Sequence, residues 1–194
     1  GLPMYSNAAG WSPEAHAAKI DWTARQLRSL PADVYGFQEL WHAASLQAIL
    51  DRSGLAADYQ MLAPPDANGT HIVCAALVRQ GLLVGAPEWL ADFPAGFRLQ
   101  SSGDDAQTPL IEVGIRGFSR PVLHFVIRPR SDDADIHVYV CHFKSKAPTQ
   151  VFKERWYKAD KATYAPHAAA LGAALSTIRR TAEAAALRWL ITQQ

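Results

Sequence analysis

The sequence predicts a sheet-rich α/β fold in which stacked β-sheets are covered by outer helices. A helical pattern, a short buried strand and a second helix come first, and several consecutive strand-like segments follow. This order favours layered sheets over a regular alternation of strands and helices. We expect residues 1–194 to form a single domain, because no internal repeat, low-complexity linker or strong interior boundary divides the chain.

The first helix is predicted from its start signal and its apolar stripe. Ser12 offers a capping hydroxyl, Pro13 suits the first helical position, and Glu14 places an acid near the positive end of the helix dipole. Pro31 then ends the pattern. The stripe has spacings of three and four and consists of Ala17, Ile20, Ala24, Leu27 and Leu30.

The next elements are a strand, a helix and a series of short strands. Residues 34–37 predict a buried strand that ends at Gln38-Glu39-Leu40, and residues 43–52 predict a helix with Gly54 just past its end. Turn-forming residues such as Asn68-Gly69 separate the segments that follow. Five short β-rich segments cover residues 59–63, 72–79, 82–86, 122–128 and 136–143.

Two further segments complete the expected architecture. Residues 101–108 are polar and predict a surface loop. A long alanine-rich helix is expected to close the chain. Its predicted apolar stripe again keeps spacings of three and four and consists of Leu171, Leu175, Ile178, Ala182 and Ala185.

Composition excludes a disordered or membrane-spanning chain. Hydrophobic residues make up 49% and charged residues 19%, and no apolar run approaches the length of a membrane span. The net charge of +1 argues neither for nor against nucleic acid, so only a local basic patch could indicate it. Cys74 and Cys141 lie in apolar segments, and we expect free buried thiols, with a disulfide as the alternative. We therefore expect a cytoplasmic location, although a segment preceding Gly1 could carry a signal.

Glu39 is the first candidate for chemistry. It follows a strand-like run, and the ends of strands position side chains rigidly while the following loop leaves room for a ligand. A carboxylate there suits a hard divalent cation such as Mg²⁺, which prefers oxygen ligands. The alternative is a solvated acid at the start of the next helix.

His142 is the second candidate. Strand alternation places it on one face with Ile136, Val138 and Val140, at the end of the segment. A histidine in that position could donate a hydrogen bond to a phosphate oxygen or assist proton transfer. The alternative is a structural histidine whose hydrogen bonds are satisfied within the protein.

Basic residues follow His142 directly. Residues 144–161 contain six basic and two acidic side chains, a local net charge of +4, and three aromatic residues interleave with them. Such a segment, beginning with Lys144 and Lys146, suits a phosphate-bearing ligand, including single-stranded nucleic acid, or forms an ordinary solvated face. Arg79 and Arg120, at the ends of strand-like segments, could face the same cleft or form ion pairs.

Four of these segments resemble, in order, motifs of the endonuclease/exonuclease/phosphatase superfamily, which includes deoxyribonuclease, apurinic-site endonuclease, sphingomyelinase and inositol-polyphosphate phosphatase types. Residues 32–39 resemble its strand ending in Gln-Glu, and residues 76–79 its strand closing on an arginine. Residues 138–146 resemble the strand that ends in the active-site histidine. The following helix resembles the family pattern R-x-x-x-E-A-x-x-L-R through Arg179, Glu183, Ala184, Leu187 and Arg188.

The resemblance implies a four-layer α/β/β/α sandwich with the active site at one end of two stacked sheets. It implies Mg²⁺ or Mn²⁺ as cofactor, with Glu39 as a metal ligand and His142 as a catalytic group that stabilises the phosphoryl transition state. Arg79, Lys144 and Lys146 are then expected to bind phosphate. The substrate would be a nucleic acid, a phospholipid head group or a sugar phosphate, which the metal would meet through the same phosphoryl group.

The sequence also departs from the family pattern at both ends. The family's first strand, which bears an active-site Asn, has no counterpart after Gly1, and its Gly-Asp-x-Asn strand and Asp-His pair have none before Gln194. We therefore expect an incomplete sandwich with little or no phosphodiesterase activity by itself, and self-association through exposed sheet edges. The alternative is a non-catalytic binding or scaffold protein that retains the same fold.

Overall fold

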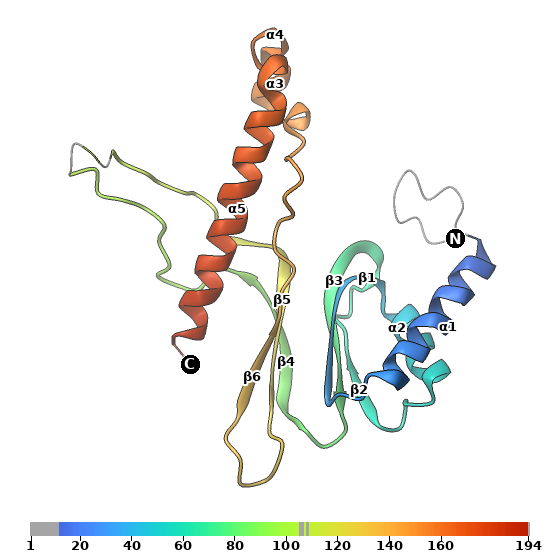
Figure 1. The fold of residues 1–194 in the computed structure, drawn as a ribbon. Coiled ribbons are helices and arrows are strands. Elements are labelled where there is room, and N and C mark those ends of the chain that lie inside the picture. The colour runs from blue at the N-terminus through green and yellow to red at the C-terminus, as the bar shows by residue number, and fades with distance from the viewer. Residues whose placement is uncertain (1–11, 105–106, 108, 194) are drawn as a thin grey trace. The chain divides into compact units, whose positions relative to one another are not determined.

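The computed structural model describes residues 12–104, 107 and 109–193, and it shows a mixed α/β chain with two three-stranded antiparallel sheets (Figure 1). The chain divides into two compact units. Unit 1 contains the described residues up to Leu90 together with Arg120–His142. Unit 2 contains Ala91–Ser119 together with the residues from Phe143 onwards.

Two helices of unit 1 form where the local signals predict them. Helix α1 spans Pro13–Ser29, and the Ser12 hydroxyl accepts a hydrogen bond from the Ala15 amide at 3.2 Å. Helix α2 spans Ala43–Ser53 and ends at Gly54, which adopts the left-handed conformation with φ 75°. A glycine enters that conformation without the steric cost that a Cβ atom imposes, so it stops the helix cleanly.

Sheet A of unit 1 consists of β1 (Val34–His42), β3 (Asn68–Arg79) and β2 (Tyr59–Leu62), in the order β1-β3-β2. The turn predicted at Asn68-Gly69 is wrong, because these two residues begin β3 and Asn68 pairs with His42. The structure shows another reason for a glycine there. A Cβ atom on Gly69 would lie 2.4 Å from Nε2 of His42, so only a glycine lets the imidazole pack against the strand.

Sheet B consists of β4 (Leu83–Asp92), β5 (Gly117–Ile127) and β6 (Ile136–Val140), in that order. The strand predicted over residues 136–143 is too long, because β6 ends at Val140. Its pairing with β5 runs from Ile127↔Ile136 to Leu123↔Val140, and the chain then leaves the sheet. His142 therefore lies two residues beyond the strand, and the face assigned to it by strand alternation is wrong.

A hydrophobic core lies between the two sheets of unit 1. From β3 it receives Cys74, Ala76 and Val78, all fully buried. Sheet B contributes Leu123, Phe125 and Ile127 from β5, with Val138 and Val140 of β6 packed against them. The indole of Trp89 in β4 donates to the Cys74 carbonyl oxygen at 3.0 Å, which adds a hydrogen bond across this core.

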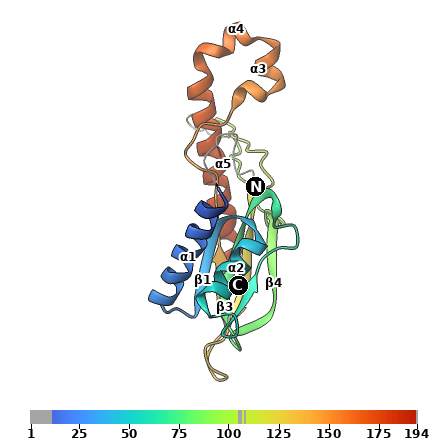
Figure 2. The same ribbon diagram turned by 90° about the vertical axis from the view of Figure 1, so that its right-hand side faces the viewer.

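A second core fills the other face of sheet A. Ala75 and Leu77 of β3 face α1 and α2, where they meet Leu27, Leu46 and Leu50. Figures 1 and 2 show both helices against this sheet. Unit 1 is therefore built of three layers, helices on sheet A and sheet A on sheet B. Over residues 73–78, strand β3 is buried on both of its faces.

The two cysteines are free thiols with different exposure. Cys74 is fully buried, as predicted, whereas Cys141 is only half-buried and lies just beyond β6. Burial raises the pKa of each thiol to about 11. Both thiols are therefore protonated and poorly nucleophilic at neutral pH.

Unit 2 contains the long helix α5 (Ala168–Ile191), which follows the short helices η1 (Val151–Lys153), α3 (Arg155–Ala159), α4 (Lys161–Tyr164) and η2 (Ala165–His167). No helix within residues 12–104, 107 and 109–193 combines the length and the apolar character that crossing a membrane requires.

The apolar stripe predicted for α5 is wrong at Leu175 and Ile178, whereas Ala182 is buried and Leu171 and Ala185 are half-buried. Leu175 and Ile178 are 43% and 44% exposed, whereas Ser176 is buried. The helix approaches the preceding chain through small residues: the Ser176 hydroxyl donates to the Ala147 carbonyl at 2.8 Å, and a Cβ atom on Gly172 would clash with the backbone at Thr149. The residues that α5 buries are Gly172, Ser176, Ala182, Glu183 and Ala186.

Aromatic rings form the other packing cluster of unit 2. Phe93 contacts Phe118 edge to face with their centroids 4.9 Å apart, and Phe118 stacks on Phe143 at 6.5 Å. Near the end of α5, Trp189 meets Phe97 at 6.0 Å. Such pairs contribute about 0.5–1.5 kcal/mol each beyond the area that they bury.

Glu183 is the most deeply buried acidic residue among those described, with no exposed surface. Its Oε1 accepts from the Ser119 amide and its Oε2 from the Lys144 amide, both at 2.7 Å. The side chain therefore ties α5 to the start of β5 and to the segment after β6. Hydrogen bonds to a carboxylate from backbone amides are short and strong.

We expect Glu183→Ala to lower the free energy of unfolding by about 2–4 kcal/mol, because two buried amides lose their acceptor. Urea denaturation of the wild type and the variant measures the change. Glu112→Ala, at an exposed glutamate of the same unit, is the matched control and should change stability by less than about 0.5 kcal/mol. Equal effects of the two substitutions would show that the Glu183 hydrogen bonds contribute nothing specific.

Candidate functional site

The candidate site begins at an irregularity in β1. Phe37 pairs with Ala75 and Leu40 pairs with Val73, so three residues of β1 match two of β3. Both Phe37 and Leu40 face the helix-side core, although normal alternation would put residues three apart on opposite faces. One extra residue therefore forms a β-bulge between them.

Glu39 lies in this bulge with φ 58°, the single positive φ among the non-glycine residues that the structure describes. The prediction that Glu39 ends the strand is wrong, because β1 continues to His42. A left-handed conformation costs a residue with a Cβ atom about 1–2 kcal/mol, and such strain collects at functional sites. Side chains at bulges are also re-aimed relative to the sheet, and 59% of the Glu39 side chain is exposed.

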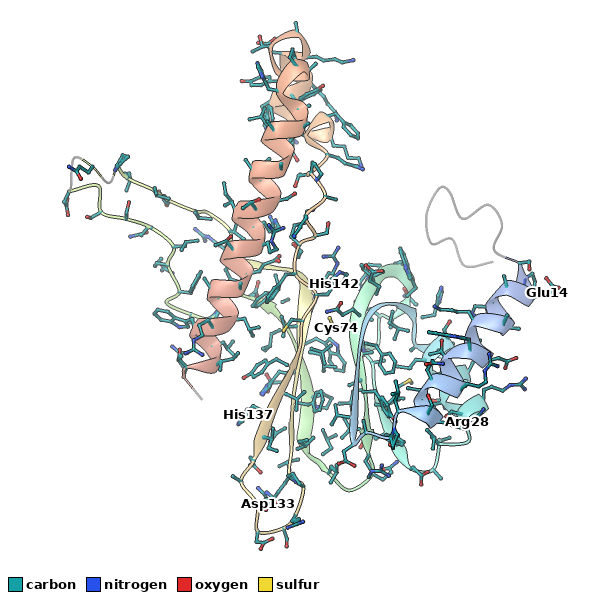
Figure 3. The ribbon with its side chains drawn as sticks, viewed as in Figure 1. Glu14, Arg28, Cys74, Asp133, His137 and His142 are labelled. Atoms are coloured by element: carbon teal, nitrogen blue, oxygen red, sulfur yellow. The ribbon has the colours of Figure 1, made fainter. Side chains whose placement is uncertain are left out.

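His142 reaches Glu39 from the segment that follows β6. Its Nε2 atom lies 3.6 Å from Oε1 of Glu39, and its side chain is only 14% exposed. Figure 3 shows His142 at the end of β6 away from the loop that carries Asp133. The resemblance implies one active site that contains both Glu39 and His142, and the structure does bring these two side chains together. Their roles as metal ligand and catalytic group stay predictions.

Two side chains fix the backbone around this pair. Gln38 donates from Nε2 to the Cys141 carbonyl at 2.5 Å, which links β1 to the residue before His142. Arg120 of β5 donates from Nη1 to the His142 carbonyl at 3.4 Å. Sequence inspection singled out Arg120 but gave Gln38 no role of its own. In the sequence, Gln38 could have been noticed because it stands directly before Glu39, at the end of an otherwise apolar segment.

A groove of 570 Å³ adjoins the pair on the side of Gln38 and Cys141. It follows the neighbouring edges of β1 and β6, which are outer strands of their sheets within the described chain. Polar and apolar surface contribute about equally to its lining, which consists of Val34, Gly36, Gln38, Val138, Tyr139, Val140 and Cys141. Gln38 and Cys141 precede Glu39 and His142 in the sequence, so the groove lies next to the pair.

Arg79 does not join this site. Its Nε donates to Asp33 at 2.7 Å and its Nη2 to the Tyr59 hydroxyl at 3.1 Å. Val34 pairs with Val78, so Arg79 lies beside the start of β1, five residues from Glu39. Five residues of extended strand span about 16 Å, too far for one phosphate to bridge. The structure shows Arg79 in the ion pair that the sequence left open.

Lys144 and Lys146 belong to unit 2. The Lys144 ammonium donates to the Ala147 carbonyl at 2.9 Å, and its backbone amide donates to Glu183. Lys146 is exposed. Both follow His142 closely in sequence, and their predicted role in phosphate binding stays a prediction.

The chemistry available at Glu39 and His142 is that of one carboxylate beside one imidazole. Within the described ranges, no three histidine, cysteine, aspartate or glutamate side chains are placed to hold a metal ion together. An exposed carboxylate can bind a divalent ion that keeps most of its waters, which is how Mg²⁺ is often held. The imidazole beside it can donate a hydrogen bond to an anion bound at that ion.

Comparison with known proteins finds no matching protein-family model, no matching curated protein and no matching solved structure. A functional assignment therefore has to come from the residues of this chain and their geometry.

If the Glu39 backbone is strained, Glu39→Gly should leave the free energy of unfolding unchanged or raise it by up to about 1 kcal/mol, because glycine tolerates a positive φ. Glu39→Val should lower it by about 1 kcal/mol or more, since β-branched residues are disfavoured there. Chemical denaturation measures both changes. Glu88→Gly, at an exposed glutamate of β4 without a positive φ, should destabilise. Equal destabilisation by the two glycine variants would show that Glu39 carries no strain.

Proposed function

We propose that this chain is a metal-dependent hydrolase of phosphoester or phosphodiester bonds, of the endonuclease/exonuclease/phosphatase type. The observation that carries the proposal is the 3.6 Å approach of Glu39 and His142. Two separate sequence motifs single out these residues, and the fold brings together Glu39 of β1 and His142 of the segment that follows β6. The proposal includes the complete four-layer sandwich, and the three layers of unit 1 support it.

Glu39 is the proposed ligand for Mg²⁺ or Mn²⁺. Its carboxylate supplies the oxygen atoms that these hard cations prefer, and its exposure leaves room for water and a phosphate group. A bound divalent ion would supply Lewis-acid polarisation of the phosphoryl group and a more acidic water. The bulge contributes by holding the carboxylate away from the β1–β3 pairing, so that Glu39 needs no further rearrangement to meet the ion.

His142 is the proposed donor to the phosphoryl oxygens. A hydrogen bond from an imidazole stabilises the negative charge that grows on these oxygens in the transition state. The ring is mostly buried, which strengthens such a hydrogen bond by excluding water. Gln38 donates to the carbonyl oxygen of Cys141, and Arg120 donates to the carbonyl oxygen of His142. These two hydrogen bonds restrain the backbone at residues 141–142, which keeps the His142 ring within reach of a phosphate at Glu39.

The proposed substrate class is a phosphate ester, with nucleic acid, phospholipid head groups and sugar phosphates as its members. Lys144 and Lys146 are proposed to attract the phosphate, since they follow His142 by two and four residues. Arg79 has no part in the proposal because its guanidinium is paired with Asp33.

Hydrolysis of bis(p-nitrophenyl) phosphate with Mg²⁺, Mn²⁺ or EDTA tests the proposal. We expect little or no turnover by this chain itself, because one carboxylate acts where such chemistry commonly uses several groups. Any trace of turnover should need the metal, and Glu39→Gln and His142→Asn should each reduce it to background. Asp66→Asn is the matched control, since Asp66 also lies beside a histidine, His71, at 3.2 Å.

Turnover at equal rates by the wild type and the Glu39 and His142 variants, or turnover that EDTA does not change, would contradict a metal-dependent hydrolase. That outcome would favour the alternative, a non-catalytic binding or scaffold protein that uses the groove beside the pair.

A further inference from the structure

Unit 2 presents a surface of aromatic and basic side chains that the proposed hydrolysis does not use. It is formed by η1, α3 and α4, at the N-terminal end of α5 (Figures 1 and 2). We call it the basic-aromatic surface, and its members are Phe152, Lys153, Arg155, Trp156, Lys158 and Lys161. We propose that the basic-aromatic surface binds single-stranded nucleic acid.

Buried residues of η1 and α3 anchor the helices that carry the aromatic side chains of this surface. Tyr157 and Val151 are buried and anchor α3 and η1, which leaves Phe152 and Trp156 53% and 39% exposed. The Trp156 indole meets the Tyr164 ring edge to face at 4.8 Å. A braced ring loses little conformational freedom when a ligand stacks on it, which favours binding. The braced Trp156 ring and the exposed Phe152 ring offer two stacking positions for unpaired bases.

The basic residues of this surface alternate with the two aromatic residues along the chain. Lys153, Arg155, Lys158 and Lys161 are all exposed. Within the part of the chain that the structure describes, no acidic side chain forms an ion pair with any of the four. Four exposed cations beside aromatic rings match a ligand that alternates phosphates with flat bases.

Single strands fit this surface better than duplexes or membranes do. The bases of a duplex are stacked on one another, so their faces cannot reach Trp156 or Phe152. Glu154 is exposed between the two rings in the sequence, and inserting these rings into an anionic bilayer would bring its carboxylate against lipid phosphates. A single strand can place a base on a ring while Glu154 stays in water.

The test measures the anisotropy of a fluorescein-labelled oligothymidylate of about 15 nucleotides in EDTA, so that no hydrolysis takes part. The inference does not rest on the proposed hydrolase activity, and the two can fail separately. We expect a dissociation constant in the micromolar range that weakens roughly twentyfold between 50 and 200 mM salt, because about three phosphates are neutralised.

Variants separate stacking from charge. Trp156→Ala should weaken binding about tenfold without changing the salt dependence, whereas Lys153→Gln with Lys158→Gln should weaken binding and flatten the salt dependence. Glu154→Gln should tighten binding, because it removes a repulsive charge. Trp22→Ala is the matched control: Trp22 is 50% exposed on α1 with the Lys19 ammonium over its ring, but it lies outside the surface.

Three results would overturn the inference: an equal affinity for a duplex of the same length, binding to phosphatidylserine vesicles without binding to the oligothymidylate, or the same small effect of Trp156→Ala and Trp22→Ala. Circular dichroism of each variant is the control for folding, because a variant counts in the test only if its helical signal matches that of the wild type.

Discussion

Both hydrophobic cores of unit 1 are built on one strand. Strand β3 buries Cys74, Ala76 and Val78 against sheet B, and Ala75 and Leu77 against the helices, so over residues 73–78 neither of its faces meets water. Three of these five side chains are small, which lets the layers approach closely. Fully burying a large aliphatic side chain contributes about 1.5–3 kcal/mol, and the partners of β3 supply most of the large ones. The layers of unit 1 therefore depend on this strand being buried on both faces.

The candidate site follows from that constraint. Strand β1 has to return Leu40 to the helix-side core after Phe37, and the bulge absorbs the extra residue that this requires. The bulge in turn exposes Glu39 beside the residues that leave β6. On the same strand, Gly36 faces sheet B, where a Cβ atom would approach Cγ2 of Val140 to 3.3 Å. The close contact of the two sheets there brings the end of β6, and hence His142, within reach of Glu39.

Local signals in the sequence predicted the elements but not their details. Ser12 and Gly54 located helix ends because capping is decided by neighbouring residues. The bulge could not be predicted, since it depends on how β1 pairs with β3, far along the chain. The end of β6 was missed because residues 136–143 are apolar almost throughout, whereas the strand stops where its pairing with β5 stops. The buried face of α5 was missed because Gly172 and Ser176 pack through close backbone approach, which hydrophobicity does not report. No local pattern indicated that Glu39 and His142 would lie close together. That expectation came from the four segments that resemble the superfamily's motifs in the same order along the chain.

The central proposal is that Glu39 binds a divalent ion beside His142, and that the two residues do not merely form an ordinary ion pair. The chain contains its own comparison, because His71 lies 3.2 Å from Asp66 in a second carboxylate–histidine pair, whose imidazole is more exposed than that of His142. The most direct measurement follows the imidazole proton resonances of both histidines while Mn²⁺ is added. The account predicts that the His142 signals broaden first, that excess Mg²⁺ restores them, and that Glu39→Gln abolishes the effect. Broadening of His71 at the same Mn²⁺ concentration, or broadening of His142 that survives Glu39→Gln, would contradict it.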